Sequence, residues 1–265
     1  MDNNALRLQY NPDGSNLRNH QLRMLDILNV VDNICQEHHL TYWISSGTLL
    51  GAVRHGGFIP WDDDLDIEMP EEDYKKFLKV VPAVLPNNLA IQTHKTDPGY
   101  VAPYAKVRDL NSEIQENEFQ DRKYRYKGVY IDVFPMGHCN IPLSEFSSRY
   151  PHYYLYMLTR KDITNKFYFT ILNVYYNLLQ VFYSICALVD KLVGVKYYNY
   201  IYGSGFWSKF PDSCIFPLSH IDFEGRSYPC PHNVKEYLTI LYGDYMSLPP
   251  ENDRMTHTLS VTLNK

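Results

Sequence analysis

Hydrophobic and acidic residues alternate strictly over residues 64–69, in the sequence DLDIEM. Strict alternation predicts a strand with one face packed on a core and a polar face opposite it. Here the polar face carries a row of carboxylates from Asp64, Asp66 and Glu68. Like charges this close disfavour ionisation, and a divalent cation would relieve them, because Mg²⁺ binds hard oxygen ligands such as carboxylates and substrate phosphates. A solvated acidic surface is the alternative.

A second strand is predicted over residues 128–135, in the sequence GVYIDVFP. Hydrophobic residues at every second position share one face, and Asp132 lies on the other face beside Tyr130. A carboxylate in so apolar a strand needs a partner, because an unpaired buried charge is costly. Two partners fit: a metal ion shared with Asp64 and Asp66, or the side chain of an arginine or lysine.

A third strand is predicted over residues 104–110, with Lys106 and Arg108 on one face. A cationic face would suit the phosphates of a nucleotide-like donor. A solvent-exposed edge strand fits the same pattern equally well, and the sequence does not separate the two.

The segment before the acidic strand predicts an anion site. A short strand over residues 42–45 leads into a Ser46-Gly47 turn and a helix over residues 48–53. A turn of small residues that begins a helix presents backbone N–H groups to an anion. Arg54 follows in a glycine-rich loop, and its guanidinium matches phosphate oxygens, although a plain connecting loop is the alternative.

The spacing of hydrophobic residues, together with helix-capping and turn residues, predicts the remaining elements. Ser15 or Asn16 is expected to cap the first helix. Helices are expected over residues 17–40, 70–81, 144–161 and 234–242, a strand over 89–92 and a hairpin over 219–231. Residues 197–213 are expected to form a loop, and residues 111–127 are rich in charged and polar side chains.

The segment from Phe167 to Val189 contains no charged residue and is long enough to span a bilayer. A polar stripe recurs at helical spacing along it, formed by Thr170, Asn173, Asn177, Gln180 and Ser184. Because a lipid-exposed span would not readily carry this stripe, a long helix buried against the domain is favoured. Attachment to a membrane interface is the second interpretation.

Composition narrows the class of protein. The chain has 265 residues and a net charge of −5, without the general basic footprint of a nucleic-acid-binding protein. Its five cysteines are scattered and form no C-x-x-C pair, which favours a reducing, cytoplasmic setting. The group Cys230, His232 and His220 is not expected to bind metal. The first residues lack the pattern of a secretory signal.

Two long motifs resemble the LicD/fukutin-type phosphotransferase family. The first runs through SGTLLGAVRH (46–55) and GFIPWDDDLDI (57–67), and the second is GVYIDVFP (128–135). The tail YGDYM (242–246), Pro249-Pro250 and His257 is also similar to the family pattern. The likeness extends from about residue 20 to residue 257.

The resemblance implies an α/β (α+β) fold of the nucleotidyltransferase type, a small mixed sheet flanked by helices. We expect an N-terminal extension over 1–16, a catalytic core over 17–145 and a helical, aromatic-rich portion over 146–265 that completes the same domain. It also implies transfer of a phospho-substituent, such as phosphocholine or a phospho-polyol, from a CDP-activated donor to a sugar of a surface glycan, with release of CMP.

Residue by residue, the resemblance makes Asp64, Asp66 and Asp132 the metal-binding and catalytic acids for Mg²⁺ or Mn²⁺, with Asp62 a weaker candidate. Ser46, Gly47 and Thr48 would line the donor phosphate, and Arg54 and Lys106 would contact phosphate or nucleotide. Asp132 is also a candidate base for the acceptor hydroxyl. His257 matches without an assigned role, and Glu68 stays outside the site.

The expected partners are a CDP-activated donor and a glycan or lipid-linked sugar acceptor, without nucleic acid. Peripheral membrane contact through residues 167–189 would place the protein in the cytoplasm at the inner face of the membrane. Two other functions stay open: a nucleotidyltransferase acting on a small acceptor or RNA, and a non-catalytic glycan-binding protein with tyrosines as its sugar platform.

Overall fold

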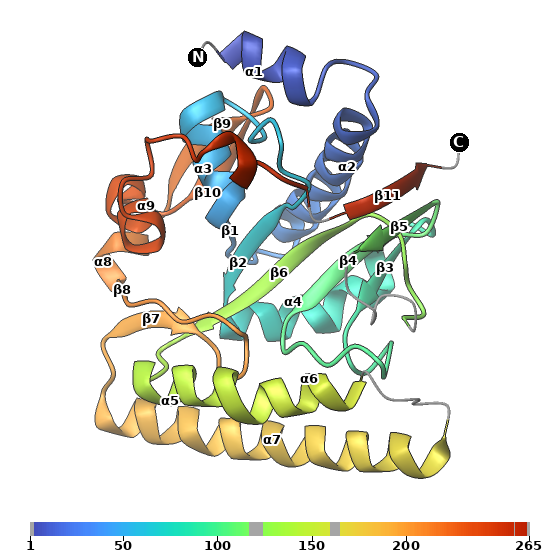
Figure 1. Cartoon of the computed structure of the whole chain (residues 1–265). Coiled ribbons are helices and arrows are strands. Elements are labelled where there is room, and N and C mark those ends of the chain that lie inside the picture. The colour runs from blue at the N-terminus through green and yellow to red at the C-terminus, as the bar shows by residue number, and fades with distance from the viewer. Residues whose placement is uncertain (1–2, 117–123, 160–164, 257, 264–265) are drawn as a thin grey trace.

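A mixed β-sheet forms the centre of the molecule (Figure 1). The computed structural model describes residues 3–116, 124–159, 165–256 and 258–263. The strand order is β1-β2-β6-β4-β3, with β7 paired to β6 and β8 to β7. These strands are β1 (Trp43–Ile44), β2 (Asp66–Pro70), β3 (Leu89–Gln92), β4 (Ala105–Asp109), β6 (Tyr130–Gly137), β7 (Tyr197–Tyr200) and β8 (Phe210–Pro211).

Helices pack against this sheet, which gives the α/β architecture expected from the sequence (Figure 1). Helices α2 and α4 pack behind the sheet, and a layer formed by α5, α6 and α7 lies below it. The helices are α1 (Asn3–Tyr10), α2 (Asn16–Glu37), α3 (Ser46–His55), α4 (Glu71–Val84), α5 (Ile141–Ser147), α6 (Tyr153–Thr159), α7 (Lys166–Val193), α8 (Asp212–Ile215) and α9 (Val234–Tyr242).

The locally encoded elements form where periodicity and capping predicted them. Ser15 caps α2, because its hydroxyl accepts a hydrogen bond from the Arg18 amide. The predicted hairpin is present as β9 (Ser219–Phe223) and β10 (Arg226–Cys230). One hydrophobic core then joins the sheet and helices with this hairpin and α9.

Two segments depart from the prediction, and a third, for which none was made, contains a strand. The expected turn at Ser46-Gly47 is already helical, because α3 begins at Ser46. Residues 197–213 contain β7 and β8 in place of a loop, and the polar stretch after residue 111 begins with β5 (Ser112–Glu116). β5 pairs with β11 (Thr258–Leu263) from the far end of the chain. Partners this distant leave no local periodicity, so the sequence pattern did not reveal them.

Strand β2 is buried on both faces, contrary to the expected open carboxylate face. It pairs with the antiparallel β1 and the parallel β6. Ile67 and Met69 are fully buried as predicted, but Glu68 on the opposite face is fully buried as well. Strand β4 is likewise an inner strand between β6 and β3, so its interpretation as an exposed edge strand was wrong.

Helix α7 is mostly exposed, so the favoured prediction of a buried helix was wrong. It passes the length and hydropathy criteria for a membrane-crossing helix, yet only 17% of its most apolar window is buried. Its inner face does pack on the domain, where Leu172, Leu179 and Tyr183 form a second hydrophobic cluster with residues of α6. The polar stripe runs along α7 beside a face of exposed apolar side chains.

Candidate functional site

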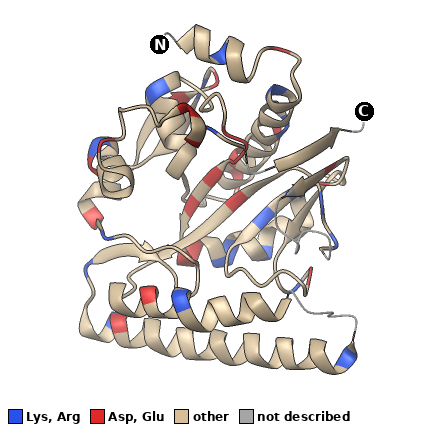
Figure 2. Cartoon of the chain, in the orientation of Figure 1, with Lys and Arg blue, Asp and Glu red and all other residues tan. Residues whose placement is uncertain are grey.

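The acids gather at one end of β2, beside the paired strand β6 (Figure 2). Carboxylate oxygens of Asp62, Asp63 and Asp64 all lie within 4.8 Å of one another. Asp66 begins β2 and stands opposite Asp132 in the register of β2 and β6. The sequence prediction that two strands would bring Asp66 and Asp132 together is therefore realised in the fold.

Helix α3 holds the acidic segment in place through close backbone approaches. A Cβ atom on Gly51 would lie 2.4 Å from the Gly57 carbonyl oxygen, so α3 packs directly on the loop before the acids. A Cβ atom on Gly47 would lie 2.9 Å from Oδ2 of Asp62. Glycine at both positions thus permits the packing that places the acids.

Two side chains fix the backbone of the acidic segment. The Thr48 hydroxyl accepts a hydrogen bond from the Asp66 amide at 2.9 Å, which joins the first turn of α3 to the start of β2. From α2, the buried Gln21 side chain donates to the carbonyl oxygen of Asp62 at 2.8 Å. Thr48 therefore positions Asp66, in addition to its predicted place near the donor phosphate.

Burial and mutual repulsion raise the pKa values of these acids. Burial, followed by the charge of Asp63, raises the pKa of Asp62 to about 7. Burial, followed by the charges of Asp62 and Asp63, raises the pKa of Asp64 to about 8. Burial and the charge of Asp132 raise the pKa of Asp66 well above its ordinary value. Such a group is stable when ionised only if positive charge is brought to it.

Lys106 supplies part of that charge from β4. Its Nζ atom lies 2.8 Å from Oδ1 and 3.0 Å from Oδ2 of Asp132. The same ammonium lies 3.4 Å from the centre of the Tyr130 ring, a cation–π contact. The lysine partner, one of the two alternatives that the sequence left open for Asp132, is thus present.

The donor set fits a hard divalent cation. Asp62, Asp64, Asp66 and Asp132 offer carboxylate oxygens, which Mg²⁺ and Mn²⁺ prefer. The nearby cations Lys106 and Arg54 compensate only part of their charge. Asp63 is engaged differently, because its carboxylate accepts a hydrogen bond from the Thr258 amide at 2.6 Å. Asp63 thereby ties β11 and the end of the chain to the acidic segment.

Of the predicted phosphate-binding residues, Ser46, Gly47 and Thr48 lie in the first turn of α3 and Arg54 lies in its last turn. Ser46 adopts a left-handed backbone conformation with φ of 47°, which is strained for a residue other than glycine. Arg54, at the other end of α3, donates to the carbonyl oxygens of Tyr245 and Ser247 at 3.3 Å. Its Nε atom is buried and has no hydrogen-bond partner among the residues that the structure describes. His257 lies outside the described residues.

An aromatic cavity of about 460 Å³ opens beside the acids. Asp64, Asp132 and Lys106 form one wall. Six aromatic residues also line it: Tyr100, Tyr104, Tyr124, Tyr130, Tyr156 and Phe206.

The rings of this cavity meet at steep angles. Tyr100 lies 6.2 Å from Tyr104 with an interplanar angle of 89°, and 5.6 Å from Tyr124 with an angle of 74°. Tyr100 is only 2% exposed, and its hydroxyl has no hydrogen-bond partner within the described part of the chain. The sequence did not identify these residues, because 24 tyrosines gave no basis for choosing among them.

Glu68 anchors the buried face of β2. Its carboxylate accepts hydrogen bonds from the Trp43 indole at 2.8 Å, the Tyr200 hydroxyl at 2.8 Å and the Tyr237 hydroxyl at 2.7 Å. These donors come from β1, β7 and α9. Glu68 thus joins the C-terminal portion to the strand that carries Asp66, a role that alternation alone did not reveal.

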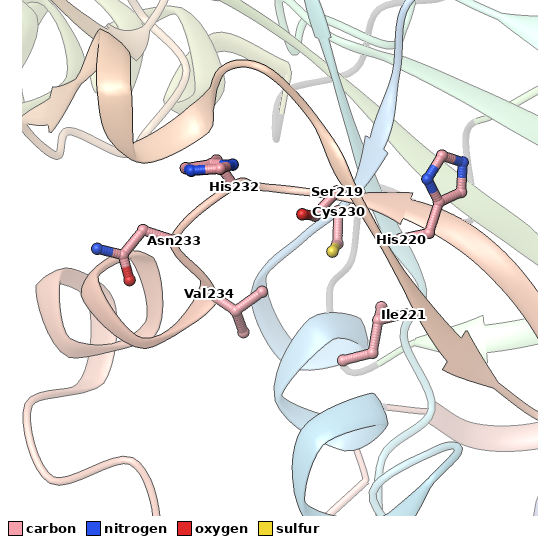
Figure 3. Close-up of a pocket in the computed structure, with 7 residues that line it drawn as sticks. All are labelled: Ser219, His220, Ile221, Cys230, His232, Asn233 and Val234. Atoms are coloured by element: carbon pink, nitrogen blue, oxygen red, sulfur yellow. The ribbon is translucent and has the colours of Figure 1, made fainter.

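The cysteine–histidine group forms a separate pocket of about 340 Å³ between the hairpin β9–β10 and α9 (Figure 3). His220 and His232 lie on opposite sides of Cys230 in this view. Within residues 3–116, 124–159, 165–256 and 258–263, the potential metal-binding group of three or more residues is the acidic one at 62–64. The pocket in Figure 3 therefore adds no ligand set to the site.

The chain is similar to known proteins. Residues 39–166 match the family described as LicD/FKTN/FKRP, nucleotidyltransferase domain. The chain is 29% identical to the lipopolysaccharide cholinephosphotransferase LicD of Haemophilus influenzae, over 91% of this chain and 95% of that protein.

Two other relatives match over shorter segments. The human ribitol 5-phosphate transferase FKRP is 56% identical over 32 residues, which is 12% of this chain and 6% of that protein. Mannosyltransferase regulator 4 of Saccharomyces cerevisiae is 24% identical over 49% of this chain and 11% of that protein. The family model covers both acidic strands, and the similarity to LicD runs over nearly the full length of both proteins, so this chain is similar to the LicD family.

Proposed function

We propose that this protein is a metal-dependent phosphotransferase that moves phosphocholine from CDP-choline to a sugar hydroxyl of a cell-surface glycan and releases CMP. Its relatives carry out phosphotransfer, since LicD is named as a cholinephosphotransferase and FKRP as a ribitol 5-phosphate transferase. The observation that carries the proposal for this chain is one cavity that is lined both by carboxylates and by aromatic rings.

The aromatic rings favour choline over an uncharged polyol as the head group. A quaternary ammonium is attracted to the faces of aromatic rings and gains most when several faces surround it. Tyr100 stands nearly perpendicular to Tyr104, which suits a compact cation better than a flat sugar stacked on one ring. Tyr130 already faces the ammonium of Lys106, so this wall accommodates positive charge.

The carboxylate wall is suited to the diphosphate end of the donor. Asp62, Asp64, Asp66 and Asp132 would hold Mg²⁺ or Mn²⁺. A cation bound there would neutralise the diphosphate and the charge that develops during phosphoryl transfer. Lys106 lies at the junction of the two walls and would contact the transferred phosphate, while Arg54 and the start of α3 would bind the rest of the diphosphate.

The transfer exchanges one P–O bond for another. An oxygen of the acceptor sugar attacks the phosphorus that carries choline, and the bond from that phosphorus to the bridging oxygen breaks. CMP leaves with the bridging oxygen and its electron pair. Asp132 is positioned at the cavity wall to take the proton of the sugar hydroxyl.

Incubation of the purified protein with CDP-choline, a lipopolysaccharide acceptor and Mg²⁺ tests the proposal. We expect CMP release and labelled glycan, and loss of both with EDTA. Release of diphosphate from CTP with transfer of CMP to an acceptor would instead identify a nucleotidyltransferase. Glycan binding without turnover of either nucleotide would identify a binding protein.

Three variants separate the roles within the site. Asp64→Asn is expected to abolish turnover and weaken Mg²⁺ binding. If Asp132→Asn kept full turnover, its role as base would be wrong and the role of Asp64 would stand. Tyr104→Leu should raise the KM for CDP-choline more than that for CDP-ribitol, whereas an equal change for the two donors would contradict a choline cage.

A further inference from the structure

We propose that the outer face of α7, together with the exposed aromatic residues of the α5–α6 segment, is a docking surface for an anionic lipid bilayer, with α7 lying in the membrane plane. Six side chains define the outer face of α7: Val174, Leu178, Val181, Phe182, Ile185 and Leu188. All six are exposed, with Val181 59% and Ile185 56% accessible. The helix has 28 residues and is about 42 Å long at 1.5 Å per residue, and the face from Val174 to Leu188 runs along about 21 Å of it.

The exposed apolar surface continues onto the neighbouring helices. Phe146, Tyr150, Tyr153 and Tyr154 are exposed on α5, α6 and the π-helical turn between them. The Tyr154 ring contacts the Tyr175 ring of α7 at 5.7 Å, which joins the two parts of the surface. Aromatic side chains with a polar tip are enriched where protein meets the membrane interface.

The inner face keeps α7 attached to the domain, which argues against a transmembrane span. His94 hydrogen-bonds with Asn173 at 2.8 Å, and Asp190 accepts hydrogen bonds from Tyr202 and from the Asn140 amide. Asp190 and Tyr183 are buried. A helix that spanned the bilayer would have to break these contacts and expose a carboxylate to lipid.

The charges around the surface favour an anionic membrane over a second copy of the chain. The segment between residues 167 and 189 has no charged side chain. Lys166, Lys191 and Lys196 are exposed at the two ends of the helix, whereas Asp190 between them is buried. Lysines that flank an apolar face are drawn to anionic headgroups while the apolar residues enter the acyl boundary.

The same helical layer borders the candidate active site. His152 in the π-helical turn and Tyr156 on α6 line the aromatic cavity. A bilayer against the opposite side of this layer would hold the cavity near the membrane surface, where a lipid-anchored glycan acceptor is presented. The inference about the membrane does not depend on the identity of the donor head group.

Flotation of the full-length protein with vesicles tests this surface. We expect it to float with phosphatidylethanolamine–phosphatidylglycerol vesicles and at least tenfold less with vesicles of phosphatidylcholine alone. The double variant Val181→Asp/Ile185→Asp should reduce flotation with the anionic vesicles by at least tenfold. The matched control is Asn177→Asp/Ser184→Asp, which places the same two charges on the exposed polar stripe and should float like the wild type.

Further measurements keep the result interpretable. Circular dichroism and the melting temperature should match between the two double variants, and CMP release with a detergent-solubilised acceptor should persist in both. Equal flotation of the two double variants would overturn the proposal. So would a wild-type dimer in light scattering that Val181→Asp/Ile185→Asp dissociates while neither protein floats, because the face would then be a subunit interface.

Discussion

Asp66 and Asp132 stand directly opposite each other where the parallel strands β2 and β6 pair. Like charges at such a position repel, and the Lys106 ammonium faces only one of them at ion-pair distance. The repulsion persists in the protein because the strands that carry the two acids are held by unrelated contacts, among them the Thr48 hydroxyl on the Asp66 amide. The repulsion lowers the stability of the folded protein, and the proposed cation would relieve it on binding.

Replacing Asp66 by asparagine should separate these two effects. Asp66→Asn removes one of the opposed charges, so in EDTA we expect it to stabilise the protein by about 1 kcal/mol, a rise in melting temperature of roughly 2–4 °C. Addition of Mg²⁺ should stabilise the wild type and leave the variant nearly unchanged. Thermal unfolding with EDTA and with Mg²⁺ measures both effects.

Asp26→Asn is the matched control, since Asp26 is exposed on α2. It should respond to Mg²⁺ as the wild type does. A lower melting temperature of Asp66→Asn in EDTA would show that the two acids do not repel each other in the folded protein.

Glu68→Gln should destabilise the protein through a single mismatched contact. The two tyrosine hydroxyls donate to Oε1, and the Trp43 indole donates to Oε2. A glutamine can keep the oxygen toward the tyrosines, but its NH₂ group then meets the indole N–H, donor against donor. We expect a loss of about 2 kcal/mol in urea unfolding.

A double-mutant cycle with Trp43→Phe tests this explanation. Removing the indole N–H relieves the clash, so Glu68→Gln/Trp43→Phe should lose less stability than the sum of the two single variants. Additive losses would mean that Trp43 and Glu68 do not act through the observed hydrogen bond.

The contrast between Glu68 and Asp66 shows what the sequence could predict. Alternation correctly gave the β2 strand and the side to which its acids point, and the apolar background of β6 correctly singled out Asp132. Alternation does not say what covers that side. Glu68 is enclosed by strands and helices from residues beyond 197, whereas Asp66 opens toward the acids.

The remaining departures have the same physical origin. Tyr100 and Phe206 meet in one cavity although more than a hundred residues separate them, and composition alone could not select them from the other aromatics. Helix α7 was predicted as buried because its polar stripe argued against exposure to lipid, but the domain covers only its inner face. Local sequence patterns predict the helices and strands and the face on which each side chain lies. They do not predict which distant residues pack against that face.

The ion pair between Arg18 and Glu224 should make stability depend on pH. Arg18 donates to both carboxylate oxygens of Glu224, at 3.0 and 2.6 Å, and the Phe58 amide donates to the same carboxylate. Burial by itself raises the pKa of Glu224, but these hydrogen bonds outweigh it and hold the pKa below the ordinary value of 4.5. The folded state therefore favours the ionised form.

A carboxyl with a lowered pKa contributes stability above its unfolded pKa and loses it as the pH falls through the folded value. Glu224→Gln should thus cost about 2 kcal/mol at pH 7, and its difference from the wild type should shrink steadily below about pH 4.5. Urea unfolding between pH 7 and pH 3 measures this.

Asp13→Asn, which removes the exposed partner of Arg7, should cause no measurable change at any of these pH values. A Glu224→Gln cost that does not vary with pH would contradict the ion-pair explanation.

Gly47→Ala should lower activity without lowering stability. Gly47 has a negative φ in the first turn of α3, so alanine fits the backbone and reduces the entropy of the unfolded chain, which favours folding by roughly 0.5–1 kcal/mol. The added Cβ would nevertheless lie 2.9 Å from Oδ2 of Asp62, and that carboxylate must move. A displaced acid costs the site part of its cation affinity, so we expect at least a tenfold fall in kcat/KM, or about 1.4 kcal/mol of transition-state stabilisation, with an unchanged or higher melting temperature.

Gly14→Ala is the comparison, because a Cβ atom there meets nothing within 4 Å, but its left-handed φ of 82° makes alanine strained. That variant should lose stability and keep its activity. Full activity in Gly47→Ala would show that the position of Asp62 does not matter to the reaction.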